Sequence, residues 1–152
     1  MIHPDQFKAM AYLGEFLYYQ GRTEEAEPPT STPQQHLHCP ALGRRPAARS
    51  FLYASRGQRD KIDANLFLEK PENVADGDRA YWIGSVYALL GDKAHALAWL
   101  RRAIDLGNHN YPWFVRDKNW NKLDGDREYE GMIAKLRNYA DQYREKFGAS
   151  SF

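Results

Sequence analysis

The fold is decided by residues 86–96, which read VYALLGDKAHA. An apolar run ends at Gly91, and a second run begins at Asp92 and carries the small residues Ala94 and Ala96. Glycine ends a helix readily because it tolerates a positive φ, and aspartate is a favoured N-cap for the helix that follows. Small side chains let two helices approach closely. The stretch therefore predicts an antiparallel pair of helices joined by a tight turn.

Two further stretches repeat this pattern. Residues 17–26 read LYYQGRTEEA, and residues 52–62 read LYASRGQRDKI. The turn glycines Gly21, Gly57 and Gly91 are spaced by 36 and 34 residues. A period near 34 residues, with an aromatic helix, a glycine turn and a second helix marked by alanine, is typical of helix–turn–helix repeat proteins.

These residues resemble the tetratricopeptide repeat (TPR) family over roughly residues 5–107. The third repeat carries the family positions most fully, at Ile83, Gly84, Tyr87, Gly91, Ala96, Leu100 and Ala103. The first repeat matches through Leu13, Gly14, Leu17, Gly21 and Ala26. The second repeat matches at Tyr53 and Gly57 but has Ser50 for the usual glycine and Ile62 for the usual alanine.

The resemblance implies an all-α fold. The expected architecture is a TPR-like right-handed superhelix of three antiparallel helix pairs with a C-terminal capping helix. The three repeats are expected at residues 5–40, 43–74 and 77–107. The spacing of apolar residues places helices at about residues 5–20, 46–56, 59–69, 77–90 and 92–106. The partner of the first helix is expected to start near Thr23 and to stop at Pro28 and Pro29.

Residues 108–152 are expected to form an aromatic turn and the capping helix. Asp126 precedes a one-sided apolar stripe, which consists of Tyr129, Met132, Ile133, Leu136, Ala140, Tyr143 and Phe147. Repeat arrays need an end helix to shield the last open face, so we expect the first four of these residues to be buried against the helix at 92–106. Residues 111–126 also resemble the ending of TPR arrays in bacterial regulatory proteins. Such arrays often follow a kinase, cyclase or DNA-binding domain, and no such domain is recognisable in these 152 residues.

Residues 28–59 differ in composition from the rest of the chain. They hold five arginines, no acidic residue and five of the eight prolines. Proline removes a backbone donor and clashes with the preceding helical turn, so we expect residues 28–45 to carry little helix and the highest mobility. Three interpretations stay open for this segment: a divergent loop-like insertion, a compensated reading-frame shift in GC-rich DNA, or an arginine-rich binding loop.

The composition excludes several classes of protein. Hydrophobic residues make up 43% and charged residues 27% of the chain, which is the globular range. No run approaches the roughly 18 apolar residues of a membrane helix, and the first residues lack the pattern of a secretory signal. The single cysteine, Cys39, excludes an internal disulfide and a cysteine-rich zinc site. A net charge of +1 gives no general attraction to nucleic acid. We expect a cytoplasmic protein.

The sequence carries no motif of a catalytic or cofactor site. It has no P-loop, no dinucleotide-binding glycine pattern, no G-x-S-x-G turn and no H-E-x-x-H zinc pair. His36, His38 and Cys39 lie close together, but a structural metal site usually needs four ligands and no second cluster offers the fourth. Cys39 as a nucleophile would need a positioned base, which a proline-rich loop would not hold. We therefore expect no enzyme activity, no cofactor and no metal.

The TPR resemblance also implies where a partner would bind. In TPR arrays the first helix of each pair lines a concave surface that receives a peptide. Carrying the family positions over gives the partner-binding candidates Lys8, Glu15, Tyr18, Tyr19, Phe51, Asp78, Tyr81, Trp82 and Ser85. Tyrosine and tryptophan are good anchors in such a surface. The competing interpretation of each aromatic residue is packing between repeats.

The expected function is a non-catalytic protein–protein interaction module, an adaptor or a regulatory scaffold, acting as a monomer or weak homodimer. The partner is a protein or peptide, and a membrane is not expected. Two alternatives stay open: a separated regulatory tail of a bacterial kinase or cyclase, and an arginine-mediated nucleic-acid binder. A chaperone C-terminus is a poor candidate ligand, because Ala11 and Glu15 stand where the family's Lys and Asn clamp would be needed.

Overall fold

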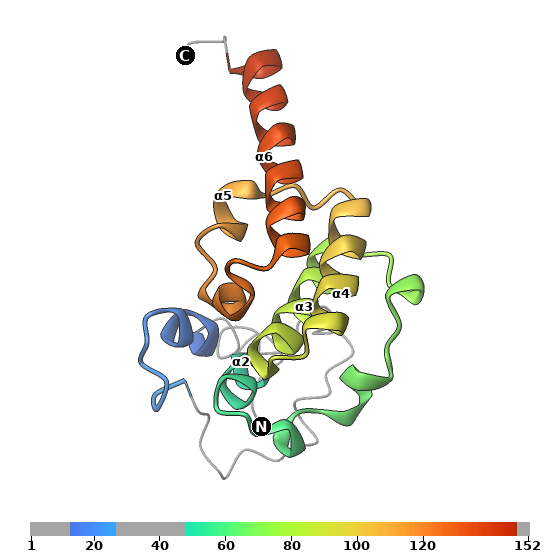
Figure 1. Ribbon diagram of the computed structural model, residues 1–152. Coiled ribbons are helices and arrows are strands. Elements are labelled where there is room, and N and C mark those ends of the chain that lie inside the picture. Colours follow the sequence, from blue (N-terminus) through green and yellow to red (C-terminus); the bar gives the residue numbers. More distant parts are fainter. Residues whose placement is uncertain (1–12, 27–47, 149–152) are drawn as a thin grey trace, which may run out of the picture. The chain divides into compact units, whose positions relative to one another are not determined.

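The computed structural model describes residues 13–26 and 48–148 (Figure 1). All regular structure in these residues is helical, which confirms the all-α prediction. Beyond a helical stretch at residues 13–19, the elements in chain order are α2 (Ala48–Ser55), η3 (Arg59–Lys61), η4 (Ala64–Leu68), η5 (Pro71–Asn73), α3 (Gly77–Leu90), α4 (Lys93–Asp105), α5 (Tyr111–Phe114), η6 (Lys118–Leu123) and α6 (Arg127–Phe147). None of these helices combines the length and apolarity needed to cross a bilayer.

The chain divides into two compact units, one up to Glu69 and one from Lys70 onward. The predictions for residues 28–45, and the first half of the helix expected at residues 5–20, concern residues outside the described ranges. The short helix expected from about Thr23 is not formed in the described residues, where residues 23–26 are turns.

In the first unit, the predicted glycine turns are confirmed. Gly21 has φ +79° and Gly57 has φ +70°, and each follows a helical segment. The Gly57 amide donates to the carbonyl of Ala54 at 3.0 Å, which closes the end of α2. Only glycine takes up this left-handed conformation without steric cost. Glycine therefore occupies these two turn positions because each requires a positive φ.

The predicted second helix of this unit, at residues 59–69, is wrong. Two short 3-10 turns, η3 and η4, replace it, because the backbone at Ile62 is extended (φ −82°, ψ 142°). The Asp63 side chain accepts a hydrogen bond from the Asn65 amide at 3.0 Å, which starts a new turn instead of continuing the old one. Aspartate competes in this way with regular helix. Ile62 and Leu66 still supply buried apolar side chains.

In the second unit, the pair formed by α3 and α4 agrees with the prediction of helices at 77–90 and 92–106. The Asp76 side chain caps α3 by accepting from the Asp78 and Arg79 amides at 2.9 and 3.1 Å. Gly91 ends α3 with φ +79°, and the Asp92 carboxylate accepts from the His95 amide at the start of α4. The predicted roles of Gly91 and Asp92 are confirmed.

At Gly84, α3 lies close to side chains of α4 and η6. A Cβ added at Gly84 would lie 3.1 Å from the Trp99 Cβ and 3.0 Å from the Trp120 Cη2. Both distances are shorter than ordinary van der Waals contact. The glycine thus lets α3 approach α4, as the repeat pattern predicts, and it also makes room for a ring from η6.

The first prediction follows from this crowding. Gly84→Ala should lower the free energy of unfolding by about 1–3 kcal/mol, because the added methyl group overpacks a closed core. Gly131→Ala is the matched control, since Gly131 lies inside α6 and nothing is within 4 Å of its added Cβ. There alanine should stabilise by about 0.4–1 kcal/mol through the unfolded chain. Urea titrations followed by circular dichroism compare the two, and equal effects at both sites would contradict the crowding.

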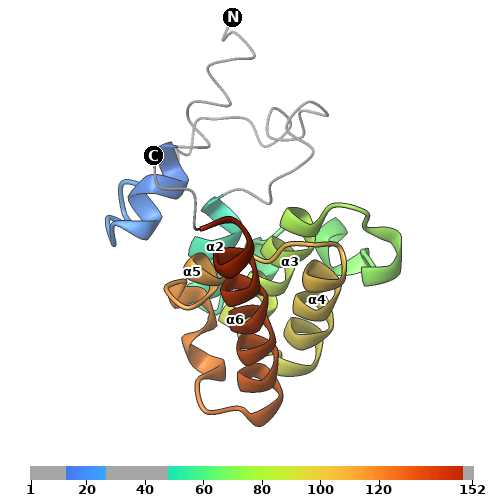
Figure 2. The same cartoon turned by 90° about the horizontal axis from the view of Figure 1, so that it is seen from above.

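The segment after α4 forms the cap, and α6 lies between α5 and α4 (Figure 2). Leu136 is fully buried and Tyr129 is 6% exposed. Met132 and Ile133 are only half-buried, so the expectation of four buried residues is right for two of them. The stripe is not covered to its end: Tyr143 and Phe147 are 54% and 62% exposed. The C-terminal half of α6 extends beyond α3 and α4 (Figure 1).

Candidate functional site

The structure places two of the expected concave-face residues in the core of the second unit. Tyr81 is 4% exposed, and its ring centroid lies 4.3 Å from that of Phe114 and 5.5 Å from that of Trp120. Its hydroxyl donates to the Asp117 Oδ2 at 2.7 Å. Tyr81 therefore holds the cap onto α3 and does not offer its ring to a ligand.

Ser85 belongs to the same closed network. Its side chain is fully buried, and its hydroxyl accepts from the Trp120 Nε1 at 3.0 Å while donating to the Tyr81 carbonyl at 3.0 Å. The Asp117 Oδ1 accepts from the Asn119 amide at 3.0 Å. The assignment of Tyr81 and Ser85 to a binding surface is corrected here. The face of α3 that carries them packs against η6 and α5, because the cap buries its aromatic side chains there.

In the first unit, Tyr18 and Phe51 are also core residues. They are 3% and 1% exposed, and their rings lie 5.8 Å apart. Tyr19 is half-buried against both rings, at 5.4 Å from Tyr18 and 6.4 Å from Phe51. The placement of Tyr18 and Phe51 on a partner surface is therefore corrected as well, and packing is the interpretation that their burial supports.

The other expected site residues differ in their exposure. Glu15 and Trp82 are half-buried. Asp78 is exposed at the start of α3, and its carboxylate accepts from the Asn108 side chain at 3.0 Å. Lys8 lies outside the described residues.

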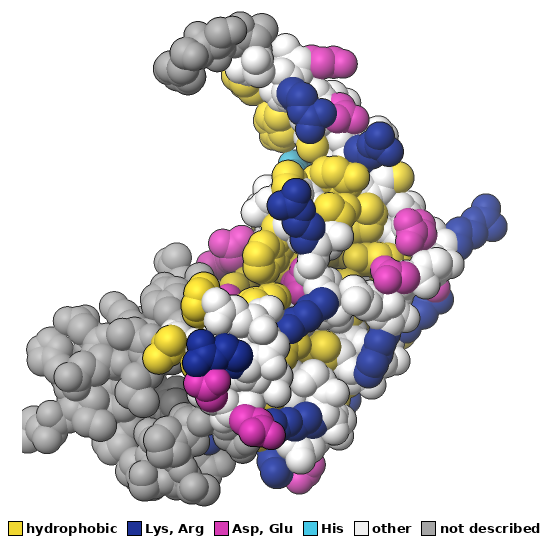
Figure 3. All heavy atoms as spheres, turned by 90° about the vertical axis from the view of Figure 1, so that its left-hand side faces the viewer, with side chains coloured by type: hydrophobic (Ala, Val, Ile, Leu, Met, Phe, Trp, Pro, Cys, Tyr) yellow, Lys and Arg dark blue, Asp and Glu magenta, His cyan; other side chains and the backbone are white. Residues whose placement is uncertain are grey.

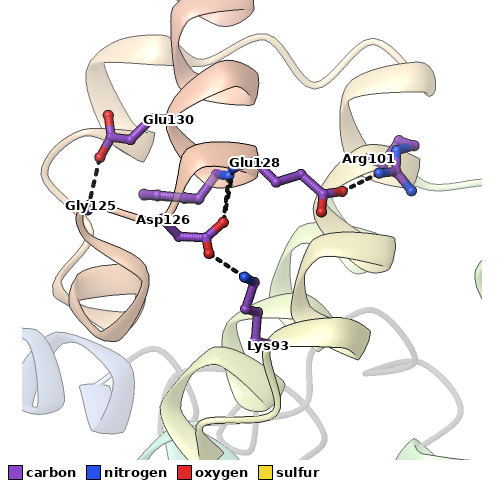
Figure 4. Close-up of polar contacts among 7 residues, drawn as sticks. Lys93, Arg101, Gly125, Asp126, Glu128 and Glu130 are labelled. Atoms are coloured by element: carbon purple, nitrogen blue, oxygen red, sulfur yellow. Dashed lines mark hydrogen bonds and ion pairs between the residues drawn. The ribbon is translucent and has the colours of Figure 1, made fainter.

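Charged side chains link α4 to the start of α6 (Figure 4). Lys93 pairs with Asp126, and Arg101 pairs with Glu128. The Asp126 carboxylate also accepts from the Glu128 and Tyr129 amides, which caps α6 as its sequence position predicts. The hydrogen bond from Lys93, and then that from the Tyr129 amide, lower the pKa of Asp126. Because these pairs are exposed to solvent, they orient α6 more than they stabilise it.

Burial raises the pKa of Tyr129 well above its ordinary value, and the charges of Asp124 and Asp117 add to the effect. A raised pKa in the folded state means that the contribution of Tyr129 to stability is complete below the unfolded value, about 10, and is lost as the pH rises above it. The second prediction is that stability falls between about pH 10 and 11, and that Tyr129→Phe weakens this fall. Urea midpoints of both proteins at pH 8 and at pH 11 measure it.

The pKa of Lys93 is also raised, mainly by its hydrogen bond to Asp126, so this pair adds to the alkaline loss in both proteins. The contribution of Tyr129 is therefore the difference in alkaline loss of stability between wild type and Tyr129→Phe. An identical alkaline loss in the two proteins would contradict the role assigned to Tyr129.

Large apolar side chains remain exposed in the second unit. They are Trp113 (41%), Val115 (48%), Tyr143 (54%) and Phe147 (62%). Hydrophobic side chains gather on the face shown in Figure 3, including along α6. The sequence offered one signal for the exposed end of α6: its stripe continues for more turns than α4 can cover, since α6 has 21 residues and α4 has 13.

Little in the described residues points to catalysis. No group of three or more His, Cys, Asp or Glu side chains there is placed to hold a metal ion. An open depression in the first unit is lined by Gly57, Arg59, Asp60, Ile62, Ala64 and Phe67. Its main feature is the Arg59 guanidinium, which lies 4.0 Å from the centroid of the Phe67 ring. The cluster of His36, His38 and Cys39 lies outside the described ranges.

Comparisons of the sequence with protein-family models, with curated proteins and with solved structures found no match.

Proposed function

We propose that this chain is a non-catalytic protein–protein interaction module with a TPR-like arrangement of its helix pairs. The observation that carries the proposal is the contrast within the second unit. Its interior is closed by internal hydrogen bonds and stacked rings, while four large apolar side chains stay exposed on α6 and at or next to α5. Exposed apolar groups on an otherwise well-packed unit are typical of interaction sites.

Local geometry supports the TPR-like part of the proposal. Gly21, Gly57 and Gly91 all have positive φ at the repeat spacing, and Gly84 allows a close approach of α3 to α4. These are the positions on which the family resemblance depends. The arrangement of the pairs as a right-handed superhelix is part of the proposal.

The proposed contact surface differs from the expected one. Tyr81 and Ser85 are buried under the cap, so a partner could reach them only after η6 had separated from α3. In the second unit, the accessible aromatics are instead Trp113, Tyr143 and Phe147, which belong to the cap itself. Burying such rings in an interface gives much binding energy at little cost in side-chain entropy.

Affinity capture from the source cells with the full-length chain tests the proposal. The triple variant Trp113→Ala/Tyr143→Ala/Phe147→Ala removes the exposed rings of the second unit, and Leu68→Ala is the control because Leu68 is 75% exposed in the other unit. We expect a protein that binds saturably to the wild type and to Leu68→Ala, and at least tenfold more weakly to the triple variant. The captured protein is then purified and titrated against all three chains. Absence of a saturable partner, or unchanged binding by the folded triple variant, would refute the proposal.

A further inference from the structure

In the C-terminal half of α6, basic side chains lie beside the exposed aromatic residues, and acidic side chains lie on the opposite side of the helix. Its exposed side carries Tyr139, Tyr143 and Phe147, which we call the C-terminal stripe. Tyr139 is half-buried and stacks on His109 with ring centroids 4.2 Å apart. Tyr143 and Phe147 stack on each other at 6.2 Å and are more than half exposed. An apolar surface on this half of the helix is therefore open to a partner.

Four cations border this stripe, and one of them is Lys135, whose Nζ lies 5.9 Å from the centroid of the Tyr139 ring. Arg144 directly follows Tyr143, Lys146 directly precedes Phe147, and Arg137 directly follows Leu136, which lies on the same side of α6 as the stripe. One residue along an α-helix is about 100° around its axis, so these side chains lie at the edges of the apolar face. The Lys146 Nζ lies 5.4 Å from the centroid of the Phe147 ring, which agrees with this placement.

The acidic residues of the same half lie elsewhere. Asp141 and Glu145 are each two residues from the nearest aromatic members of the stripe, which is about 200° around the helix axis. Arg144 pairs with Asp141 at 3.0 Å, but both side chains are exposed, at 72% and 47%. An exposed pair of this kind contributes little, so a carboxylate of a partner can compete for Arg144.

In the first turn of α6 the acidic residues Glu128 and Glu130 flank Tyr129, but their partners lie within the unit. Glu128 pairs with Arg101, and the Glu130 Oε1 accepts from the Gly125 amide at 3.2 Å (Figure 4). Along α6, the exposed part of the apolar face is thus bordered by positive charge alone.

We propose that the C-terminal stripe docks an amphipathic helical segment of a partner protein, whose apolar anchors are flanked by Asp and Glu. This inference rests on the proposed function and names the chemistry of the partner. Positive borders favour acidic flanks through charge complementarity. A second copy of this chain fits less well, because an antiparallel pair of α6 helices would bring the same cations toward each other, and like charges in contact are destabilising. About three turns of a partner helix match the length of the exposed half.

Two synthetic peptides of about 16 residues test the inference. Both carry the same helical leucine stripe, flanked by Glu in one and by Lys in the other. Fluorescence anisotropy with the full chain measures each affinity at low and at physiological salt. We expect the acidic peptide to bind at least tenfold tighter than the basic one, with a preference that shrinks as salt is added.

Two variants separate the contributions of the rings and of the charges. Tyr143→Ala/Phe147→Ala should weaken the acidic peptide at least tenfold. Arg137→Glu/Arg144→Glu/Lys146→Glu should reverse the preference between the peptides. Lys70→Glu/Arg56→Glu/Lys61→Glu is the control for net charge, since it makes the same change in charge at residues outside α6, and it should keep the preference. Circular dichroism checks that each variant is folded.

Several results would overturn the inference. These are equal binding of the two peptides, an unchanged preference after charge reversal on α6, a wild-type dimer that the ring variant abolishes, or binding of anionic lipid vesicles in place of the acidic peptide. If a partner captured from cells still depends on Tyr143 and Phe147 while the acidic peptide shows no preference, the proposed function stands and the acidic chemistry of the partner is refuted. If no saturable partner is captured at all, the proposed function itself fails.

Discussion

Replacing Trp120 by alanine should lower the free energy of unfolding by about 3–5 kcal/mol, the range for buried tryptophan. Trp120 is 1% exposed although it lies in a short 3-10 helix rather than in one of the long helices. Its ring stacks on Tyr81 at 5.5 Å and on Tyr129 at 5.9 Å, so it joins α3 to α6. Truncation would leave a cavity at the point where the cap meets the helix pair.

The loss of stability expected for Trp120→Ala also includes the loss of a hydrogen bond. The Trp120 Nε1 donates to the buried Ser85 hydroxyl, so a variant without the indole nitrogen deprives that hydroxyl of its donor. Trp120→Phe keeps most of the apolar volume but not this hydrogen bond, and its cost should lie between those of wild type and alanine. Urea unfolding followed by circular dichroism at neutral pH gives all three values.

Trp113→Ala is the matched control for Trp120→Ala. Trp113 lies on α5 in the same cap but is 41% exposed, so its replacement should cost less than half as much. Similar losses at the two tryptophans would show that Trp120 is not the centre of this core.

Leu136→Ala should cost about 2–5 kcal/mol, because Leu136 is fully buried in α6. Other residues of the same apolar stripe are buried to smaller extents, so their replacement should cost less stability. Ile133→Ala should cost less, since Ile133 is half-buried, and Tyr143→Ala should stay within about 0.5 kcal/mol, since Tyr143 is 54% exposed. Urea unfolding of the three variants tests whether burial along α6 ends where the structure places it.

A chain that ends at Asp124 lacks α6 and should melt at a lower temperature than the full chain. It loses the buried side chains of Tyr129 and Leu136 and the pairs from α4 to α6. Melting at an unchanged temperature would contradict the assignment of α6 as a cap.

The sequence alone was sufficient for the elements whose signals are local. Gly91 and Asp92 predicted the turn between α3 and α4, and Asp126 predicted the start of α6, because capping and positive φ depend on the residues within one or two turns. The helix expected at residues 59–69 failed for an equally local reason. Asp63 accepts from the Asn65 amide and begins a new turn there, and the repeat pattern outweighed that signal in the prediction.

The placement of the aromatic residues was decided by tertiary structure. Tyr81, Ser85 and Trp120 are separated by up to 39 residues, and nothing in their spacing shows that the cap returns to cover α3. Helical periodicity identifies the apolar face of a helix but not the segment that covers it, so a side chain in the core and one on a partner surface look alike in the sequence. Tyr81 was therefore assigned to a binding surface although it is buried, and the apolar pattern of α6 did not distinguish the exposed Tyr143 and Phe147 from the buried Leu136. The sequence shows the charges on α6, but it does not show that Tyr143 and Phe147 are exposed. That exposure comes from the tertiary structure, and it is the reason that these charges border a candidate docking surface.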